Sequence, residues 1–231
     1  NLPGGIAVLA IAEKGNLFNA PETYMDKIAT GKIDKGLIDL DYTLEKNIKN
    51  LSEFKKKNYS SLTVCILNRP RHKKIIDKLN ELNVKVKLIN DGDVLGALYV
   101  SNPKYNVDMF LGIGGGPEGV LAASALDAYD CHFQGRFIFD NKKNIEEAKL
   151  IGIEDLDKKY ELNEIIRGDS IFCATGITSS DVLKGISIDK DKFISETLIT
   201  HKATNYKKIV KNINPINEWY LFLEKNGLKK K

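Results

Sequence analysis

Two arginines separated by one proline follow directly after an apolar run at residues 62–67. Proline restricts the backbone between the two guanidinium groups of Arg69-Pro70-Arg71. A guanidinium presents donors in a planar fork that matches phosphate oxygens. The spacing therefore indicates a rigid pair of cations suited to a phosphate ester. An ordinary basic turn on the surface is the alternative interpretation.

A second polar segment, Asp91-Gly92-Asp93, follows the apolar run at residues 84–89. Gly92 supplies backbone freedom, and Asp93 is placed to cap the helix that comes next. Asp91 has no structural duty of that kind. Its carboxylate is a candidate to accept hydrogen bonds from sugar hydroxyls or to contact a metal. A plain turn before a capped helix is the alternative.

Three glycines, 114–116, separate a third apolar run at residues 107–113 from Pro117 and Glu118. Glycines between a strand and a helix leave backbone N–H groups accessible, and the helix dipole favours an anion there. Pro117 suits the first helical position, which places Glu118 in the first turn. There its carboxylate either complements the dipole or holds a divalent cation beside the phosphate. The spacing does not match a dinucleotide-binding fingerprint.

The elements that position these residues alternate between strands and helices. The pattern predicts strands at 62–67, 84–89 and 107–113, and helices at 73–82, 93–100 and 117–128. Strands separated by helices of about ten residues indicate βαβ units and a parallel sheet. The three polar segments should therefore meet at the edge where the strands end, which is where such sheets bind ligands.

The segments before and after this repeat are less regular. Residues 6–12 predict a strand buried on both faces, with 17–19 as its hairpin partner. The other predicted elements are a helix at 22–30, a strand at 36–40, a helix at 44–57 capped by Thr43, a strand at 171–174, and an antiparallel pair at 192–200 and 206–213.

Composition excludes several classes of protein. The 231 residues are 42% hydrophobic and 29% charged, as in ordinary globular proteins. A net charge of +4 is too balanced to indicate nucleic-acid binding. Three cysteines without paired spacing indicate reduced thiols and a cytoplasmic location. No apolar run approaches the roughly 20 residues of a membrane span, and no zinc-ligand spacing or serine–histidine–acid arrangement is evident.

Taken in order, these segments resemble the class II (GlpX-type) fructose-1,6-bisphosphatases. The resemblance covers nearly the whole chain, and several uncommon motifs in the right order carry it. The matching stretches include Ala7-Val8-Leu9-Ala10, Asn19-Ala20-Pro21 with Tyr24-Met25, Gly36-Leu37-Ile38-Asp39-Leu40, Arg69-Pro70-Arg71-His72, Asp91-Gly92-Asp93-Val94, Gly112 to Val120, and Ala174-Thr175-Gly176-Ile177-Thr178.

The resemblance implies an α/β fold of the lithium-sensitive, metal-dependent phosphatase superfamily, with αβαβα layers and a mixed sheet that contains parallel βαβ units. It implies hydrolysis of the 1-phosphate of fructose 1,6-bisphosphate to fructose 6-phosphate, a step of gluconeogenesis, with Mg²⁺ or Mn²⁺. By motif, Glu118 corresponds to a metal ligand. The implied substrate-binding residues are Tyr24, Arg69, Pro70, Arg71, Asp91, Gly92, Asp93 and Gly115.

The sequence also departs from the family's pattern. Arg69 stands where some relatives carry lysine, and Gly116 where many have alanine. Family members have a further N-terminal segment on the order of a hundred residues, which carries the other acidic metal ligands and a Glu-Gly-Thr motif. Two-metal hydrolysis needs several carboxylates, so we expect the catalytic residues in that segment and expect the isolated chain to be inactive. On this interpretation residues 1–58 are the remainder of an N-terminal α+β domain, and 59–231 form a C-terminal α/β domain with the substrate-phosphate loops.

Other functions stay open from sequence. A non-catalytic sugar-phosphate-binding protein would use the same loops, whereas a nucleotide-binding module is suggested only by the glycine-rich turn. Sedoheptulose 1,7-bisphosphate shares its reacting end with the fructose compound, so the sequence does not separate the two substrates. The expected partner is a sugar bisphosphate, with neither nucleic acid nor membrane, and a homo-oligomer is the commoner assembly for such enzymes.

Overall fold

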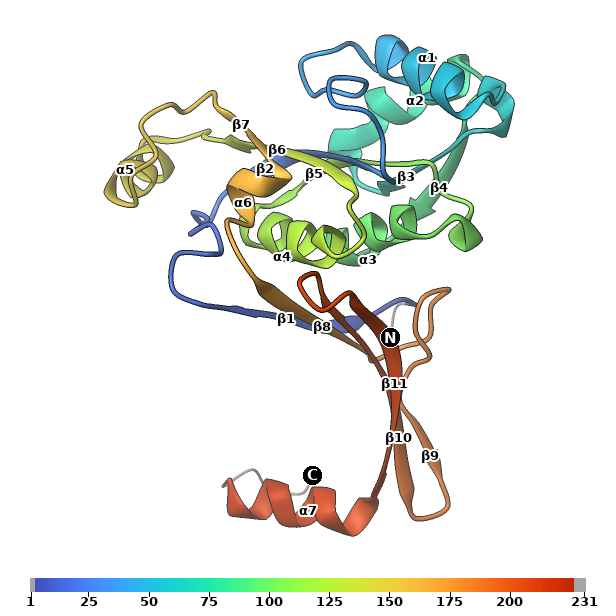
Figure 1. Cartoon of the computed structure of the whole chain (residues 1–231), viewed down its shortest axis with the longest axis vertical. Helices are drawn as coiled ribbons and strands as arrows, with labels where there is room; N and C mark the ends of the chain where they lie inside the picture. Colours follow the sequence, from blue (N-terminus) through green and yellow to red (C-terminus); the bar gives the residue numbers. More distant parts are fainter. Residues whose placement is uncertain (1–2, 227–231) are drawn as a thin grey trace.

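Two β-sheets with helices packed between them form the framework of the chain (Figure 1). The computed structural model describes residues 3–226. The larger sheet contains, in spatial order, β4 (Lys85–Ile89), β3 (Thr63–Leu67), β5 (Met109–Gly115), β2 (Tyr24–Thr30), β6 (His132–Ile138) and β7 (Lys159–Glu161). The smaller sheet contains β1 (Ile6–Ala12), β8 (Ser170–Gly176), β10 (Lys192–His201) and β11 (Tyr206–Pro215), with β9 (Ser187–Asp189) paired to β10.

The larger sheet is mixed, as predicted. Strands β3, β4 and β5 are parallel, which confirms the interpretation of the strand–helix alternation. Strand β2 lies between β5 and β6 and is antiparallel to both. Because β2 runs in the opposite direction, its first residue, Tyr24, lies opposite Gly115 at the edge where β5 ends.

Helices cover both faces of this sheet. Helices α1 (Leu44–Lys55) and α2 (Lys73–Glu81) lie on one face, while α3 (Asp93–Leu98) and α4 (Gly116–Asp127) lie between the two sheets (Figure 1). Helix α4 is buried almost all round, because it packs between two apolar sheet faces. The remaining helices are α5 (Lys142–Leu150), α6 (Leu162–Ile165) and α7 (Ile216–Lys225).

Two apolar clusters correspond to the two interfaces of this layered arrangement. The larger fills the space around α3 and α4 and includes Phe110, Phe133 and Phe172. The smaller lies beneath α1 and α2 and includes Ile48 and Val64. The sheet that carries the polar loops is therefore fixed by a packed core on each face.

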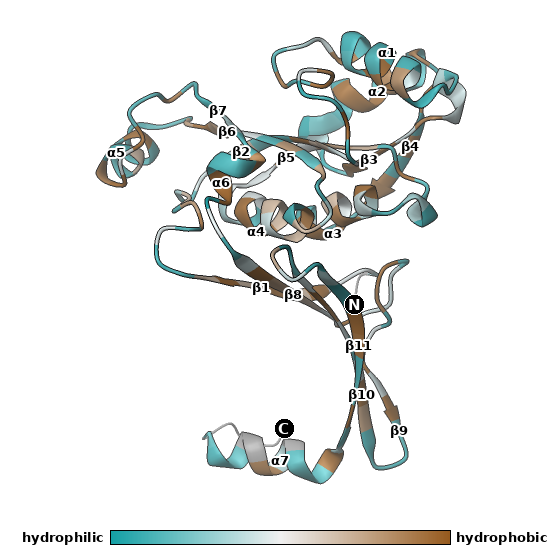
Figure 2. Cartoon of the chain, in the orientation of Figure 1, coloured by the Kyte–Doolittle hydropathy of each residue, from teal (hydrophilic) through white to brown (hydrophobic). Residues whose placement is uncertain are grey.

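The outer face of the smaller sheet is partly exposed in the described part of the chain. Leu9 and Ile11 on β1 are 47% and 58% exposed, so the prediction that this strand is buried on both faces was wrong. Figure 2 shows hydrophobic residues along β1 and β8. Helix α7 does not cover them, since it lies beyond the end of β11 (Figure 1). Residues 3–226 form four of the five predicted layers: α1 with α2, the larger sheet, α3 with α4, and the smaller sheet.

Two predicted elements before residue 41 have a different conformation. The segment predicted as a helix at 22–30 is the strand β2. The segment 36–40 is a loop whose backbone bonds to α1: Asn47 Nδ2 donates to Asp39 O at 2.8 Å, and Asn50 Nδ2 donates to Leu37 O at 2.8 Å. These amide side chains satisfy the backbone where a neighbouring strand was expected.

The predicted hairpin at the start of the chain is also absent from the described residues. Leu17 forms an isolated antiparallel bridge with Ile166 instead of pairing with β1, and Phe18 N–H donates to Ile165 O at 2.9 Å. Other predictions were right. Thr43 caps α1 by accepting the Lys46 N–H at 3.2 Å, and β10 and β11 form the predicted antiparallel pair.

Strands from both predicted segments contribute to both sheets. Strands β1 and β2 come from residues 1–58, yet β1 pairs with β8 and β2 lies between β5 and β6. The division at residue 58 stays a prediction. Among the described residues, no helix has both the length and the apolar character that a membrane span requires, and the three cysteines are unpaired thiols.

Candidate active site

The three polar loops predicted from sequence meet at one edge of the larger sheet. They follow the ends of the parallel strands β3, β4 and β5, and backbone and side-chain bonds join them directly. Asn68 N–H donates to Ile89 O at 2.8 Å, which links the first loop to the second. Arg71 Nε donates to Ile113 O at 2.9 Å, which links the first to the third. The predicted convergence is therefore present in the fold.

A buried histidine fixes the arginine loop beneath this edge. Ile113 N–H donates to His72 Nε2 at 2.8 Å, so the other ring nitrogen, Nδ1, carries the proton and donates to Leu67 O at 2.8 Å. The imidazole is fully buried and bridges the ends of β3 and β5. Gly112 has φ +145°, and a Cβ there would lie 3.1 Å from His72 Cε1. His72 is thus part of the framework of the site.

Tyr24 and Arg71 form one side of the site. The Tyr24 side chain begins β2, is 47% exposed, and lies opposite Gly115 in the register. The guanidinium carbon of Arg71 is 5.0 Å from the centre of the Tyr24 ring, within the range of a cation–π contact. Pro70 begins the 3-10 turn Pro70–His72 that carries Arg71. The adjacent ring and the bond to Ile113 together hold the guanidinium at the sheet edge.

Arg69 and Asp91 face each other across the first two loops. Their closest atoms, Nη2 and Oδ1, are 3.4 Å apart, and the Asp91 side chain is 74% exposed. An exposed pair at that distance contributes little to stability. Both side chains remain accessible to solvent, so each is available to a polar ligand.

Asp93 has a different environment from the one that its sequence position predicted. Gly92, with φ +91°, occupies the cap position of α3, and Asp93 is the first helical residue. The Asp93 carboxylate is buried and forms an ion pair with the buried ammonium of Lys27. It also lies against Gly114, where any Cβ would overlap it. The expectation that Asp93 caps the helix was wrong, because the buried lysine competes for its carboxylate.

The glycines at the end of β5 and the start of α4 serve a purpose that was not predicted from the sequence. A Cβ on Gly114 would overlap the carboxylate of Asp93, and one on Gly115 would overlap that of Glu118. Gly116 N–H, which we expected to be open to an anion, donates to Thr23 O at 2.7 Å. These glycines therefore make room for two carboxylates, and at least one of their N–H groups is already bonded.

Glu118 lies in the first turn of α4 and is exposed. It lines a cavity of about 330 Å³ together with Tyr24, Gly115 and Asp140. Asp140 Oδ1 accepts hydrogen bonds from Asn141 Nδ2 at 2.8 Å and Asn144 Nδ2 at 3.0 Å. Asp140 was not predicted as a site residue, because no strand was predicted at β6, which ends two residues before it.

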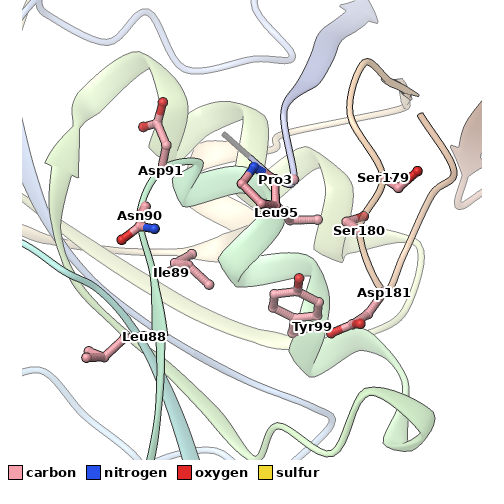
Figure 3. Close-up of a pocket in the computed structure, with 11 residues that line it drawn as sticks. Pro3, Leu88, Ile89, Asn90, Asp91, Leu95, Tyr99, Ser179, Ser180 and Asp181 are labelled. Atoms are coloured by element: carbon pink, nitrogen blue, oxygen red, sulfur yellow. The ribbon is translucent and has the colours of Figure 1, made fainter. Parts of the chain in front are cut away.

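A larger cavity, of about 450 Å³, lies beside the second loop (Figure 3). Asn90 and Asp91 line it together with Tyr99 and with Ser179 to Asp181, which come from the segment after β8. Glu118 does not line it. Neither arginine of the first loop lines either cavity, but the Tyr24 ring that Arg71 contacts lines the smaller one.

Electrostatics at the site depend on burial as well as on charge. Burial lowers the pKa of Lys27 below its ordinary value, and the adjacent Asp93 carboxylate opposes that shift, as Glu118 does more weakly. Burial raises the pKa of Asp26, the residue before Lys27 in β2, above its ordinary value. Two neighbouring charged residues in a central strand are unusual, and they interrupt the apolar pattern of a buried strand.

The described residues offer few ligands for a metal ion. No group of three or more His, Cys, Asp or Glu side chains within residues 3–226 is arranged to hold one. Divalent Mg²⁺ and Mn²⁺ prefer carboxylate oxygens, and three acidic residues, Glu22, Glu118 and Asp140, line the smaller cavity. This set fits as part of a metal site, but it falls short of what two-metal hydrolysis needs.

The sequence matches the family described as bacterial fructose-1,6-bisphosphatase, glpX-encoded, over residues 1–214. It is 38% identical over 224 residues to a protein of Synechococcus sp. (strain JA-2-3B'a(2-13)), an alignment that covers 91% of this chain and 65% of that protein. It is 35% identical over 230 residues to one of Thermosynechococcus vestitus, covering 94% of this chain and 66% of that protein.

Both of these relatives are named D-fructose 1,6-bisphosphatase class 2/sedoheptulose 1,7-bisphosphatase. A relative from Trichodesmium erythraeum has the same name and is 33% identical over 228 residues, which is 93% of this chain and 66% of that protein. The chain therefore spans about two thirds of the length of the curated relatives that it matches, and about a third of each relative has no counterpart in the alignment.

Proposed function

Because the chain belongs to the family of bacterial, glpX-encoded fructose-1,6-bisphosphatases, we propose that it supplies the sugar-phosphate loops and one metal ligand of a sugar-bisphosphate phosphatase. The reaction is hydrolysis of the 1-phosphate of fructose 1,6-bisphosphate. The observation that carries the proposal is the meeting of Arg71, Tyr24 and Glu118 at one sheet edge, around the end of β5.

The arginine loop binds a phosphate group of the substrate. Arg71 is oriented by its bond to Ile113 O and by the Tyr24 ring, so its terminal nitrogens are directed with little loss of side-chain entropy on binding. Arg69 adds a second cation, which exchanges its exposed partner Asp91 for a phosphate oxygen. Tyr24 and Gly115 contact the substrate from the β2–β5 side.

The second loop recognises the sugar. Asp91 is exposed and accepts hydrogen bonds from hydroxyl groups, while Gly92 and the buried Asp93 fix the backbone that presents it. A carboxylate that accepts hydrogen bonds from hydroxyl groups discriminates between sugars by the positions of those groups rather than by the number of carbons in the sugar. Sedoheptulose 1,7-bisphosphate, named for the relatives, has the same reacting end and is a second substrate under this proposal.

Glu118 holds a Mg²⁺ or Mn²⁺ ion, with Asp140 in the same cavity. When bound, such an ion polarises the phosphoryl oxygens and activates water. The other carboxylates that a two-metal reaction requires would then belong to the part of the family's sequence, about a third of each relative, that this chain does not match. By itself, the described site binds a sugar phosphate and does not hydrolyse it at an appreciable rate.

The wider setting of the enzyme is also a proposal. Reduced cysteines favour the cytoplasm, and burial raises the pKa of Cys65 and Cys131 to about 12, which keeps both as protonated thiols. We further propose a homo-oligomer, and a functional division between residues 1–58 and 59–231, in which β1 and β2 belong to an N-terminal unit built into both sheets.

A second function is favoured by one observation. Since the described residues contain no group of three potential metal ligands, a protein composed of them alone would be a non-catalytic sugar-phosphate-binding protein. The two functions share a binding site and differ in turnover. Phosphate release that stays at the background rate, together with intact sugar-phosphate binding, would identify the binding protein.

Binding is tested by calorimetry with fructose 1,6-bisphosphate. Arg71→Ala should weaken binding by about 1.5–3 kcal/mol, the scale of a charged hydrogen bond, and Arg69→Ala somewhat less. Both effects should shrink at high salt. Lys73→Ala is the matched control, because Lys73 is exposed and pairs with Asp77 one turn along α2. Equal affinity in all variants would reduce the arginine loop to an ordinary surface turn.

A further inference from the structure

A fully buried lysine lies beneath the candidate active site. Lys27, in the central strand β2, has no exposed surface. Lysines are almost never fully buried unless paired, and the ammonium of Lys27 forms an ion pair with the Asp93 carboxylate. The sequence analysis gave it no role, because residues 22–30 were predicted to be helical.

Lys27 connects three elements that carry site residues. It belongs to β2, which begins at Tyr24, and its partner Asp93 is the first residue of α3, directly after the loop with Asp91 and Gly92. A Cβ on Gly119 of α4 would lie 3.1 Å from Lys27 Cε. The helix that carries Glu118 thus approaches the lysine stem closely because position 119 has no side chain.

The Asp93 carboxylate is held from two sides. Lys27 attracts it from β2, and the strand β5 accommodates it because Gly114 has no Cβ. Gly92 takes a left-handed conformation immediately before Asp93. The conformation of the loop at residues 90–93 therefore depends on an anchor at its end, and that anchor is the buried ion pair.

We propose that Lys27 is a positioning residue for the sugar-phosphate site. By holding Asp93, it fixes the loop that presents Asp91. This inference rests on the proposed function only in assigning that loop and Glu118 to the substrate and the metal. The anchoring of the loop is a property of the chain alone.

A purely structural ion pair is the competing explanation. Replacing both members of a buried pair with neutral side chains often restores stability, whereas removing one member leaves an unpaired buried charge. Two neutral side chains would remove that penalty but would not orient the loop. Stability and loop order therefore separate the two explanations.

The test uses the whole chain in three variants: Lys27→Met, Asp93→Asn and the double variant. Lys55→Met is the control, since Lys55 pairs with the buried Asp108 at 2.8 Å, far from the site in the fold, and Asp108 keeps a second partner in Lys57. Amide hydrogen exchange is measured by mass spectrometry on peptides that cover residues 88–95 and, for reference, β10. This readout needs neither metal nor substrate.

We expect exchange in residues 88–95 to be about tenfold faster in Lys27→Met and in the double variant, the scale of losing one charged hydrogen bond. The reference peptide and the Lys55→Met variant should match the wild type. The double variant should melt near the wild-type temperature, which keeps the test valid if Lys27→Met fails to fold. Unchanged exchange at 88–95 in the folded double variant would overturn the proposal.

Calorimetry with fructose 1,6-bisphosphate then separates this inference from the proposed function. If Arg71→Ala weakens binding and the double variant binds about tenfold more weakly than the wild type, both stand. If Arg71→Ala weakens binding and the double variant binds as the wild type does, the role of Lys27 is overturned and the function stands. If the wild type binds no sugar bisphosphate, the proposed function fails, and the exchange result alone decides whether Lys27 anchors the loop.

Discussion

Replacing Glu118 with glutamine separates a metal ligand from a residue that only complements a helix dipole. The structure puts Glu118 in the first turn of α4, where a negative charge contributes about 0.3–1 kcal/mol. The Lys27 ammonium also interacts with this carboxylate. Loss of the charge should therefore lower the free energy of unfolding by up to about 1 kcal/mol under either explanation.

The two explanations differ once metal is added. An ion present at a hundred times its dissociation constant stabilises the folded state by about 2.7 kcal/mol, which raises the melting temperature of a domain of this size by roughly 5–10 °C. If Glu118→Gln weakens metal binding by tenfold or more, the same metal concentration gives at most about 1.4 kcal/mol, and the rise in melting temperature is halved or smaller.

The assay is a series of thermal melts of the catalytically competent enzyme across a range of MnCl₂ concentrations, with phosphate release measured on the same samples. Glu146→Gln, an exposed acid on α5, is the control for the substitution itself. We expect the Glu118 variant to lose activity by orders of magnitude and to need more metal. A Glu118→Gln enzyme with a wild-type metal curve and wild-type activity would refute the reasoning.

Three further results are expected. Gly114→Ala should cost at least about 1–3 kcal/mol by chemical denaturation, because a Cβ there displaces the buried Asp93 carboxylate; Gly115→Ala should cost less, since the Glu118 side chain is exposed and can move. Lys159 and Arg136 hold the pKa of Asp41 at about 2, below its ordinary 3.8. Wild type should therefore exceed Asp41→Asn in unfolding free energy above pH 4 by about 1 kcal/mol after solvent screening, and the difference should vanish as the pH falls towards 2. A phosphate-release assay of the isolated 231-residue chain with Mn²⁺ should find no appreciable turnover, and a rate near 10 per second, typical of enzymes, would contradict the need for further carboxylates.

The polar loops were predictable because each follows a continuous apolar run, and parallel strands bring such ends together. The positions of Arg71, Asp91 and Glu118 needed only that rule. The strand β2 was not predictable in this way, because Asp26 and Lys27 interrupt its apolar pattern. A buried charge is stable only with a partner, and the partner, Asp93, is 66 residues away in the sequence.

The same reason accounts for the other differences. Segment 36–40 has the composition of a strand, yet the side chains of Asn47 and Asn50 in α1 bond to its backbone carbonyl groups. The sequence of the segment itself does not indicate those bonds. The glycines at 114 and 115 were interpreted through the anion that they might bind, whereas the structure shows that they admit the side chains of Asp93 and Glu118. In each case local sequence identified the position, and a distant side chain decided the conformation.

The central claim, that one sheet edge binds the sugar phosphate, is tested most directly by a crystal structure of the chain with fructose 1,6-bisphosphate. We expect a phosphate group in contact with Arg69 and Arg71, with the sugar between Tyr24 and Asp91. Occupancy of the larger cavity beside Tyr99 and Ser180 instead (Figure 3), with the arginine loop unoccupied, would contradict it.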